Sequence, residues 1–75
     1  MTEQDFFARI QETLEVDDPI DRSTSLEDFE EYDSLGILNL MTLFDEMDVD
    51  VDQDSFGDVK TGEDLLRLAG DKIDA

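Results

Sequence analysis

The sequence predicts an all-α fold, a small four-helix bundle with three main helices and one short helix. In three separate segments apolar residues recur at every third or fourth position, a spacing that places them on one face of a helix. Residue types that cap helices stand directly before these segments. The chain has 75 residues, which predicts a single domain over residues 1–75 with a modest core.

The first helix is predicted over residues 3–15. Thr2 and Asp5 have the spacing of a capping box at its start. The apolar residues that recur every four positions on one face are Phe6, Ile10 and Leu14. This face is expected to pack against the core.

A long connection, residues 16–32, follows the first helix. Pro19 biases the residue before it away from helix. A connection of this length in a small domain is typically either functional or disordered. Leu26 and Phe29 are spaced to pin the connection to the core. We therefore expect an ordered loop that sets the position of Ser34.

The second helix is predicted over residues 34–47, because Asp33 and Ser34 are both N-cap residue types. Five apolar residues form the stripe that would face the core: Ile37, Leu40, Met41, Phe44 and Met47. A second ridge off this stripe consists of Leu35, Leu38 and Thr42. Apolar residues that the core does not need predict a docking surface. A central helix that is buried on both sides is the alternative.

The remaining segments are short. Residues 48–54 alternate acidic and apolar side chains, but a lone strand would have nothing to pair with, so a loop is predicted. A short helix is predicted over residues 55–59, with Phe56 and Val59 buried.

The last helix is predicted over residues 62–69. Thr61 and Asp64 repeat the spacing of a capping box at its start. Gly70 has the residue type that commonly ends helices, and Ile73 is expected to add one further core contact.

The charge is strongly one-sided, with 23 acidic and five basic residues and a formal net charge of −18. Binding to nucleic acids or to anionic membrane surfaces depends on clustered Lys and Arg. The few basic residues of this chain are scattered, so neither is an expected partner. A protein with a basic patch is the expected complement, and salt would weaken the attraction. Asp45 and Glu46 place negative charge at the end of the second helix, where the helix dipole disfavours it.

Cysteine and histidine are both missing from the sequence. The chain therefore has no thiol nucleophile and lacks the usual general base and zinc ligand. We expect no catalytic residues, no metal site and no enzymatic activity. The N-terminus does not read as a signal peptide, and no apolar run approaches the ~20 residues that a membrane-spanning helix needs. These observations predict a cytoplasmic monomer that does not insert into membranes.

Ser34 is the candidate functional residue. A serine at a helix N-terminus exposes its hydroxyl where the helix dipole and unpaired N–H groups favour a phosphate. The motif Asp33-Ser34-Leu35 stands at the start of the second predicted helix, and the segment Leu26–Phe29 precedes it. The chain as a whole is acidic. In these features, over residues 26–69, the chain resembles the acyl carrier protein family.

The resemblance implies a carrier-protein fold and a 4′-phosphopantetheine arm on Ser34, flanked by Asp33 and Leu35. A phosphopantetheinyl transferase would attach the arm from coenzyme A. The arm would then carry acyl groups as thioesters to enzymes of fatty acid, polyketide or related biosynthesis. These enzymes would bring basic patches to the second helix, at Leu35, Leu38, Thr42, Asp45 and Glu46.

A related branch supplies an alternative cargo. Gly36 and Asn39 are uncharged where carriers of fatty acid synthesis commonly have acids, and Thr42 replaces a frequent methionine. Gly36 after Asp-Ser-Leu, and Ser55-Phe56 later on, resemble D-alanyl carrier proteins. An aminoacyl cargo is therefore the alternative.

Calcium binding is the alternative from a different class, as a single EF-hand-like module at residues 52–63. Phe56 falls at the fifth loop position, where an oxygen ligand is needed, which disfavours this interpretation. The residues that match the first, third, sixth, eighth and twelfth loop positions are Asp52, Asp54, Gly57, Val59 and Glu63.

Overall fold

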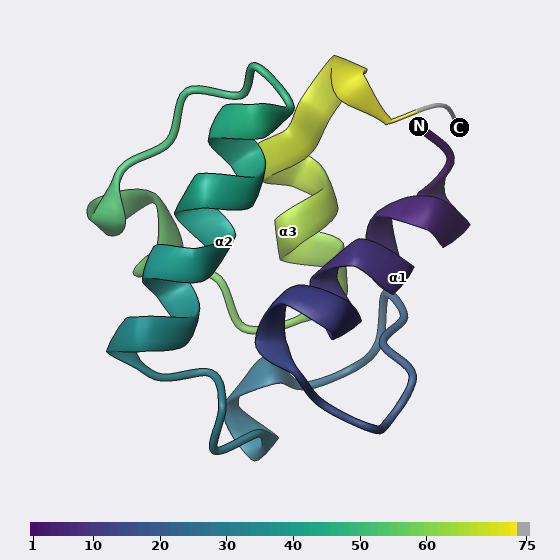
Figure 1. Cartoon of the computed structure of the whole chain (residues 1–75), viewed down its shortest axis with the longest axis vertical. Helices are drawn as coiled ribbons and strands as arrows, with labels where there is room; N and C mark the ends of the chain where they lie inside the picture. The colour runs from purple at the N-terminus through teal and green to yellow at the C-terminus, as the bar shows by residue number, and fades with distance from the viewer. Residues whose placement is uncertain (74–75) are drawn as a thin grey trace.

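Three α-helices and three 3₁₀ turns are connected by loops (Figure 1). The computed structural model describes residues 1–73. The α-helices are α1 (Glu3–Leu14), α2 (Ser34–Glu46) and α3 (Gly62–Ala69), and the turns are η1 (Leu26–Asp28), η2 (Gln53–Phe56) and η3 (Gly70–Lys72). These residues contain no strand, and Ser25 and Thr61 form an isolated antiparallel bridge. The mostly helical character was predicted correctly.

The fourth element differs from the prediction. A short helix was expected over residues 55–59, whereas η2 is a single 3₁₀ turn that begins at Gln53, so a four-helix bundle is not confirmed. The Asp52 carboxylate explains the earlier start, because it accepts the Ser55 N–H at 2.9 Å and caps the turn there. Sequence analysis had assigned Asp52 to the preceding loop.

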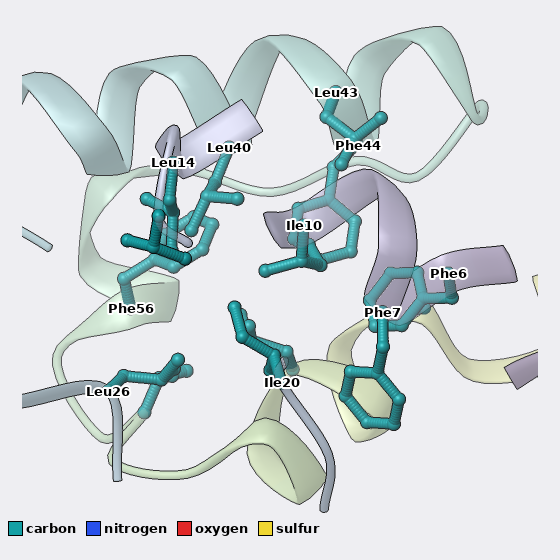
Figure 2. Packing of buried hydrophobic residues seen from close by; sticks show 14 residues of the cluster. Phe6, Phe7, Ile10, Leu14, Ile20, Leu26, Leu40, Leu43, Phe44 and Phe56 are labelled. Carbon is teal, nitrogen blue, oxygen red and sulfur yellow. The ribbon is translucent and has the colours of Figure 1, made fainter. Parts of the chain in front are cut away.

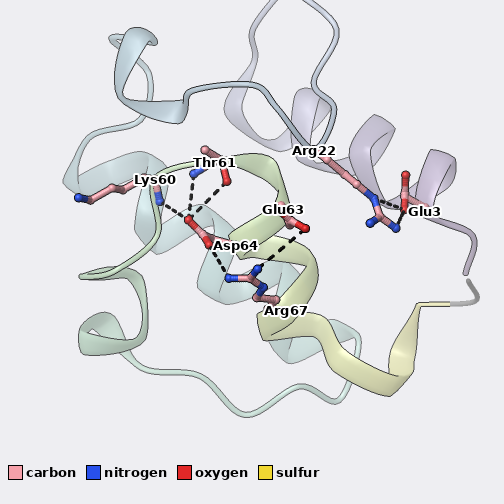
Figure 3. Close-up of polar contacts among 7 residues, drawn as sticks. All are labelled: Glu3, Arg22, Lys60, Thr61, Glu63, Asp64 and Arg67. Carbon is pink, nitrogen blue, oxygen red and sulfur yellow. Dashed lines mark hydrogen bonds and ion pairs between the residues drawn. The ribbon is translucent and has the colours of Figure 1, made fainter.

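The predicted bounds of the main helices are nearly correct. The first helix ends one residue early because Glu15 takes a left-handed conformation with φ 59°. The second also ends one residue early, at Glu46. The third was predicted at its observed bounds, and its capping box is present: the Asp64 carboxylate accepts the Thr61 N–H at 3.2 Å (Figure 3). Gly70 is its C-cap, with φ 58°, as expected.

The core fills the space that the three helices and the loops enclose (Figure 2). Phe44 lies at its centre, with ring centroids 5.9 Å from both Phe6 and Phe56. Each such side chain contributes about 1.5–3 kcal/mol when fully buried. The side chains with almost no exposed surface are Phe6, Ile10, Leu26, Leu40, Phe44 and Leu65.

The buried face of α2 is wider than the predicted stripe. Leu40 and Phe44 are fully buried as expected, but Leu43 is also buried, although it lies off the stripe. Leu43 lines the hollow between α1 and α2, while Phe44 packs against both Phe6 of α1 and Phe56 of η2. Contacts with α1 and with η2 therefore account for the broader face.

The connection between α1 and α2 is anchored to the start of α3. The Leu26 N–H donates to the Lys60 carbonyl at 2.9 Å, and the Gly62 N–H donates to the Thr24 carbonyl at 3.1 Å. A β-carbon on Gly62 would overlap the carbonyl oxygen of Asp21, so this close approach requires glycine. The connection before Ser34 is therefore held against the start of α3 by backbone hydrogen bonds.

An ion pair between Arg22 and Glu3 joins the same connection to the first turn of α1 (Figure 3). The connection is thus held at both α1 and α3. None of the helices in residues 1–73 is both long enough and apolar enough to cross a membrane.

Candidate functional site

Asp33 forms the N-cap of α2. Its backbone is extended, and its Oδ1 accepts the N–H of Gly36 at 2.9 Å. Its carbonyl accepts the first intrahelical bond, from the Ile37 N–H, at 2.9 Å. The sequence offered two N-cap residue types, and the structure assigns the role to Asp33. Ser34 is the first residue of the helix.

Ser34 is exposed, and its hydroxyl has no hydrogen-bond partner among residues 1–73. The N–H groups of Ser34 and Leu35 also donate to no described residue, as is usual at the first turn of a helix. A free hydroxyl beside two free amides at the positive end of the helix dipole suits a phosphate ester. The residues present therefore fit a phosphate-linked group on Ser34.

Gly36 fixes the loop that leads into this site. It is buried, and a β-carbon there would overlap the carbonyl oxygen of Glu31 and lie 3.1 Å from Cδ2 of Leu14. In the structure the backbone of the preceding loop, at Glu31, lies against the start of α2 at this point.

The predicted docking ridge lies outside the core. Leu35 is 66% exposed and Leu38 is 53% exposed, and both are unusually open for large apolar side chains. Thr42 is exposed as well, and its hydroxyl donates to the Leu38 carbonyl at 3.2 Å. The alternative of a helix buried on both sides is therefore wrong. The ridge begins directly beside Ser34.

Acidic side chains continue this surface at the far end of α2. Asp45 and Glu46 are exposed, and neither forms an ion pair with another residue of the described chain. The last turn of α2 contains no basic residue to offset the helix dipole. The negative charge at this end of α2 is therefore not offset by an ion pair within residues 1–73.

Tyr32, two residues before Ser34, was not singled out from the sequence. Its hydroxyl is buried without a hydrogen-bond partner among the described residues. Burial raises the pKa of Tyr32, and the negative charges of Glu27 and Asp64 raise it further. The hydroxyl is therefore neutral at physiological pH. The only sequence signal was that Tyr32 is the single tyrosine of the chain.

The segment proposed as a calcium loop has a different geometry. The Asp52 carboxylate caps η2 through Ser55, and Phe56 lies in the core at 3% exposure. Glu63 lies in the first turn of α3, near Arg67. No group of three or more acidic residues within residues 1–73 is arranged to hold a metal ion. The calcium alternative has no support from this geometry.

Comparisons of the chain with protein-family models, with curated proteins and with solved structures found no match. An assignment of function therefore depends on the residues around Ser34 and on their geometry.

Proposed function

We propose that this protein is a carrier that receives a 4′-phosphopantetheine group on Ser34 and presents acyl or aminoacyl groups to partner enzymes. One observation carries the proposal. Because Asp33 caps α2, the hydroxyl of Ser34 is left exposed and without a partner in residues 1–73, beside two free amides. A serine that served only as a cap would have its oxygen bonded to the helix backbone.

The modification itself is a phosphoryl transfer. The Ser34 Oγ forms a bond to the β-phosphorus of coenzyme A, and the bond from this phosphorus to the bridging pyrophosphate oxygen breaks. Adenosine 3′,5′-bisphosphate leaves with that oxygen, and a base of the transferase takes the serine proton. The chain contains no histidine that could act as this base. The attached group supplies the thiol, absent from the sequence, on which cargo is held as a thioester.

The roles of the neighbouring residues follow from their positions. Asp33 holds the start of α2, and the free amides of Ser34 and Leu35 favour the phosphate. Leu35, Leu38 and Thr42 form the apolar and polar ridge that a transferase or processing enzyme contacts. The acidic end of α2 steers basic patches toward this ridge.

The fold belongs to the same proposal. A carrier must display one serine at a fixed helix start and keep the neighbouring helix face accessible. The anchored connection before Ser34 and the exposed ridge of α2 support a carrier-type helical fold.

The test is an intact-mass measurement after incubation with coenzyme A, magnesium and a broad-specificity phosphopantetheinyl transferase. We expect one phosphopantetheine on the wild type and none on Ser34→Ala. Ser25→Ala is the matched control, because the Ser25 hydroxyl also has no partner among the described residues but does not start an α-helix. Failure of the wild type to gain mass with several transferases would reject the proposal. Equal loss of loading in both variants would assign the effect to the fold.

A further inference from the structure

A groove runs between α1 and α2, and its near end is lined by Asp33 and Leu35, the two neighbours of Ser34 in the chain. Its first part, about 150 Å³, is lined by Asp33, Leu35 and Gly36 together with residues at the end of α1. Its second part, about 450 Å³, continues toward Arg9 and Glu46. Thr13 and Asn39 line both parts, so the two hollows adjoin. We call this feature the α1–α2 groove.

Several polar side chains in the walls of the α1–α2 groove are unengaged, although Asp33 and Thr42 are bonded to the backbone of α2. Thr13 and Asn39 make no side-chain hydrogen bond with any other residue in 1–73. Arg9 forms no ion pair within the same residues, although the chain has only five basic side chains. Buried Leu43 also lines the second part. A polar lining with free donors and acceptors suits a ligand rich in amide and hydroxyl groups.

We propose that the α1–α2 groove holds the arm carried by Ser34, with Thr13 and Asn39 as hydrogen-bonding partners for its amides. This inference rests on the proposed carrier function. It adds that the arm lies along the protein on the α1 side of α2, while Leu38, which is exposed and lines neither part of the groove, stays open to partners.

The dimensions agree with this placement. Ser34 and Leu43 are nine residues apart on one helix, which corresponds to roughly 14 Å at about 1.5 Å per residue. The arm has about thirteen bonds between phosphorus and sulfur, and an extended chain advances about 3.5 Å per three bonds, which gives roughly 15 Å. The thiol would therefore reach the part of the groove lined by Arg9, Glu12 and Glu46.

The absence of cysteine makes a direct test possible, because the arm would supply the only thiol. The loaded protein is labelled on this thiol with a nitroxide, and paramagnetic broadening of backbone amide signals is measured by NMR. We expect strong broadening at Arg9, Thr13 and Leu43. Amides of α3, such as that of Arg67, serve as the internal reference and are expected to keep their intensity.

Two variants test the groove itself. Thr13→Trp fills it, and the broadening at Arg9 is expected to disappear, whereas Asp58→Trp, at an exposed site that does not line the groove, should leave it unchanged. Asn39→Ala avoids a bulky side chain, and the docked-to-free ratio should fall about fivefold, the effect of one lost hydrogen bond.

The outcomes separate this inference from the proposed function. Failure to load the arm would overturn both. Complete loading with equal broadening on the Leu38 side and on the Arg9 side of α2 would overturn the groove alone, since the arm would then extend freely into solvent. Unchanged broadening in both Thr13→Trp and Asn39→Ala would overturn it as well.

Discussion

The Oδ1 atom of Asp33 accepts the N–H of Gly36 at 2.9 Å. This bond assigns the helix cap to Asp33, whereas the sequence alone allowed either Asp33 or Ser34 to be the cap. Asp33 stabilises the start of α2, and the hydroxyl of its neighbour Ser34 remains free. The chain thus keeps a helix cap and an exposed nucleophile on consecutive residues. Stability and loading should therefore respond to different substitutions.

Asp33→Ala is expected to lower the free energy of unfolding by about 1 kcal/mol, the usual cost of a lost N-cap. Ser34→Ala is expected to change it by less than about 0.5 kcal/mol, as for other exposed sites. Urea denaturation followed by circular dichroism measures both values. A larger loss for Ser34→Ala than for Asp33→Ala would show that the serine has the structural role.

Gly36→Ala is expected to destabilise the protein by about 1–3 kcal/mol, because the new methyl group would overlap the carbonyl oxygen of Glu31. Gly57→Ala is the matched control. Gly57 has φ −60°, and a β-carbon there would lie 3.2 Å from the Asp54 carbonyl, so only a small shift is needed. Thermal unfolding of the two variants should separate them clearly. Equal melting temperatures would contradict the close packing at Gly36.

Features that depend on neighbours in the chain could be predicted from the sequence, whereas contacts made only in the folded structure could not. Helical periodicity and caps predicted α1, α2 and α3 to within one residue, because these signals depend on neighbours in the chain. The exposure of Leu35 and Leu38 was predicted from their place off the core stripe. That the Glu31 carbonyl is the neighbour of Gly36 was not predictable, since it depends on how the preceding loop folds back onto the start of α2.

The same distinction applies to the candidate site. The Asp33-Ser34 pair identified it, yet which residue caps the helix depends on backbone geometry. Tyr32 was missed because its burial arises from tertiary packing that also brings Glu27 and Asp64 near its ring. The α1–α2 groove was missed for a similar reason, since Thr13 and Asn39 come to line the same hollow only in the folded chain.

Tyr32→Phe is expected to leave the fold intact and to raise the free energy of unfolding by up to about 1 kcal/mol. The tyrosine hydroxyl is buried without a partner in the described residues, and an unsatisfied buried donor is costly. Denaturant unfolding of the two proteins measures the difference. A clear loss of stability would show that the hydroxyl has a bonding partner in solution.

The titration of Tyr32 provides a separate prediction. Burial and the nearby carboxylates raise its pKa above the ordinary value of 10.0, so its midpoint in the folded protein should lie above that value. Tyr32 is the only tyrosine, so the ultraviolet absorbance of tyrosinate reports on it alone. A midpoint at or below 10.0 would contradict the buried position of its hydroxyl.

Asp64 should make stability depend on pH in the acidic range. Backbone N–H groups of Lys60 and Thr61 bond to its carboxylate and lower its pKa below the ordinary 3.8 (Figure 3). A lowered folded-state pKa means that the stabilisation is complete above the unfolded-state pKa and is lost as pH falls through the folded-state value. Asp64→Ala should therefore be destabilising at neutral pH, with a difference from wild type that shrinks below about pH 3.8.

The matched control for this measurement is Asp58→Ala, which removes an exposed carboxylate that bonds to no described residue. It should show no comparable dependence on pH. Denaturant unfolding of both variants across the acidic range supplies the comparison. A difference between Asp64→Ala and wild type that stays constant through the acidic range would rule out the linkage.

Asp45→Asn should slow loading by the transferase, with the effect in KM rather than in kcat, because Asp45 lies on the proposed docking face and away from the reacting hydroxyl. Asp58→Asn changes the net charge by the same amount but lies outside that face. If docking depends on local charge, Asp45→Asn should have the larger effect, and added salt should reduce the difference. Equal effects of the two substitutions would mean that the partner senses only the overall charge of −18. In that case α2 would lose its assignment as the docking surface, while the modification of Ser34 would stand on its own test.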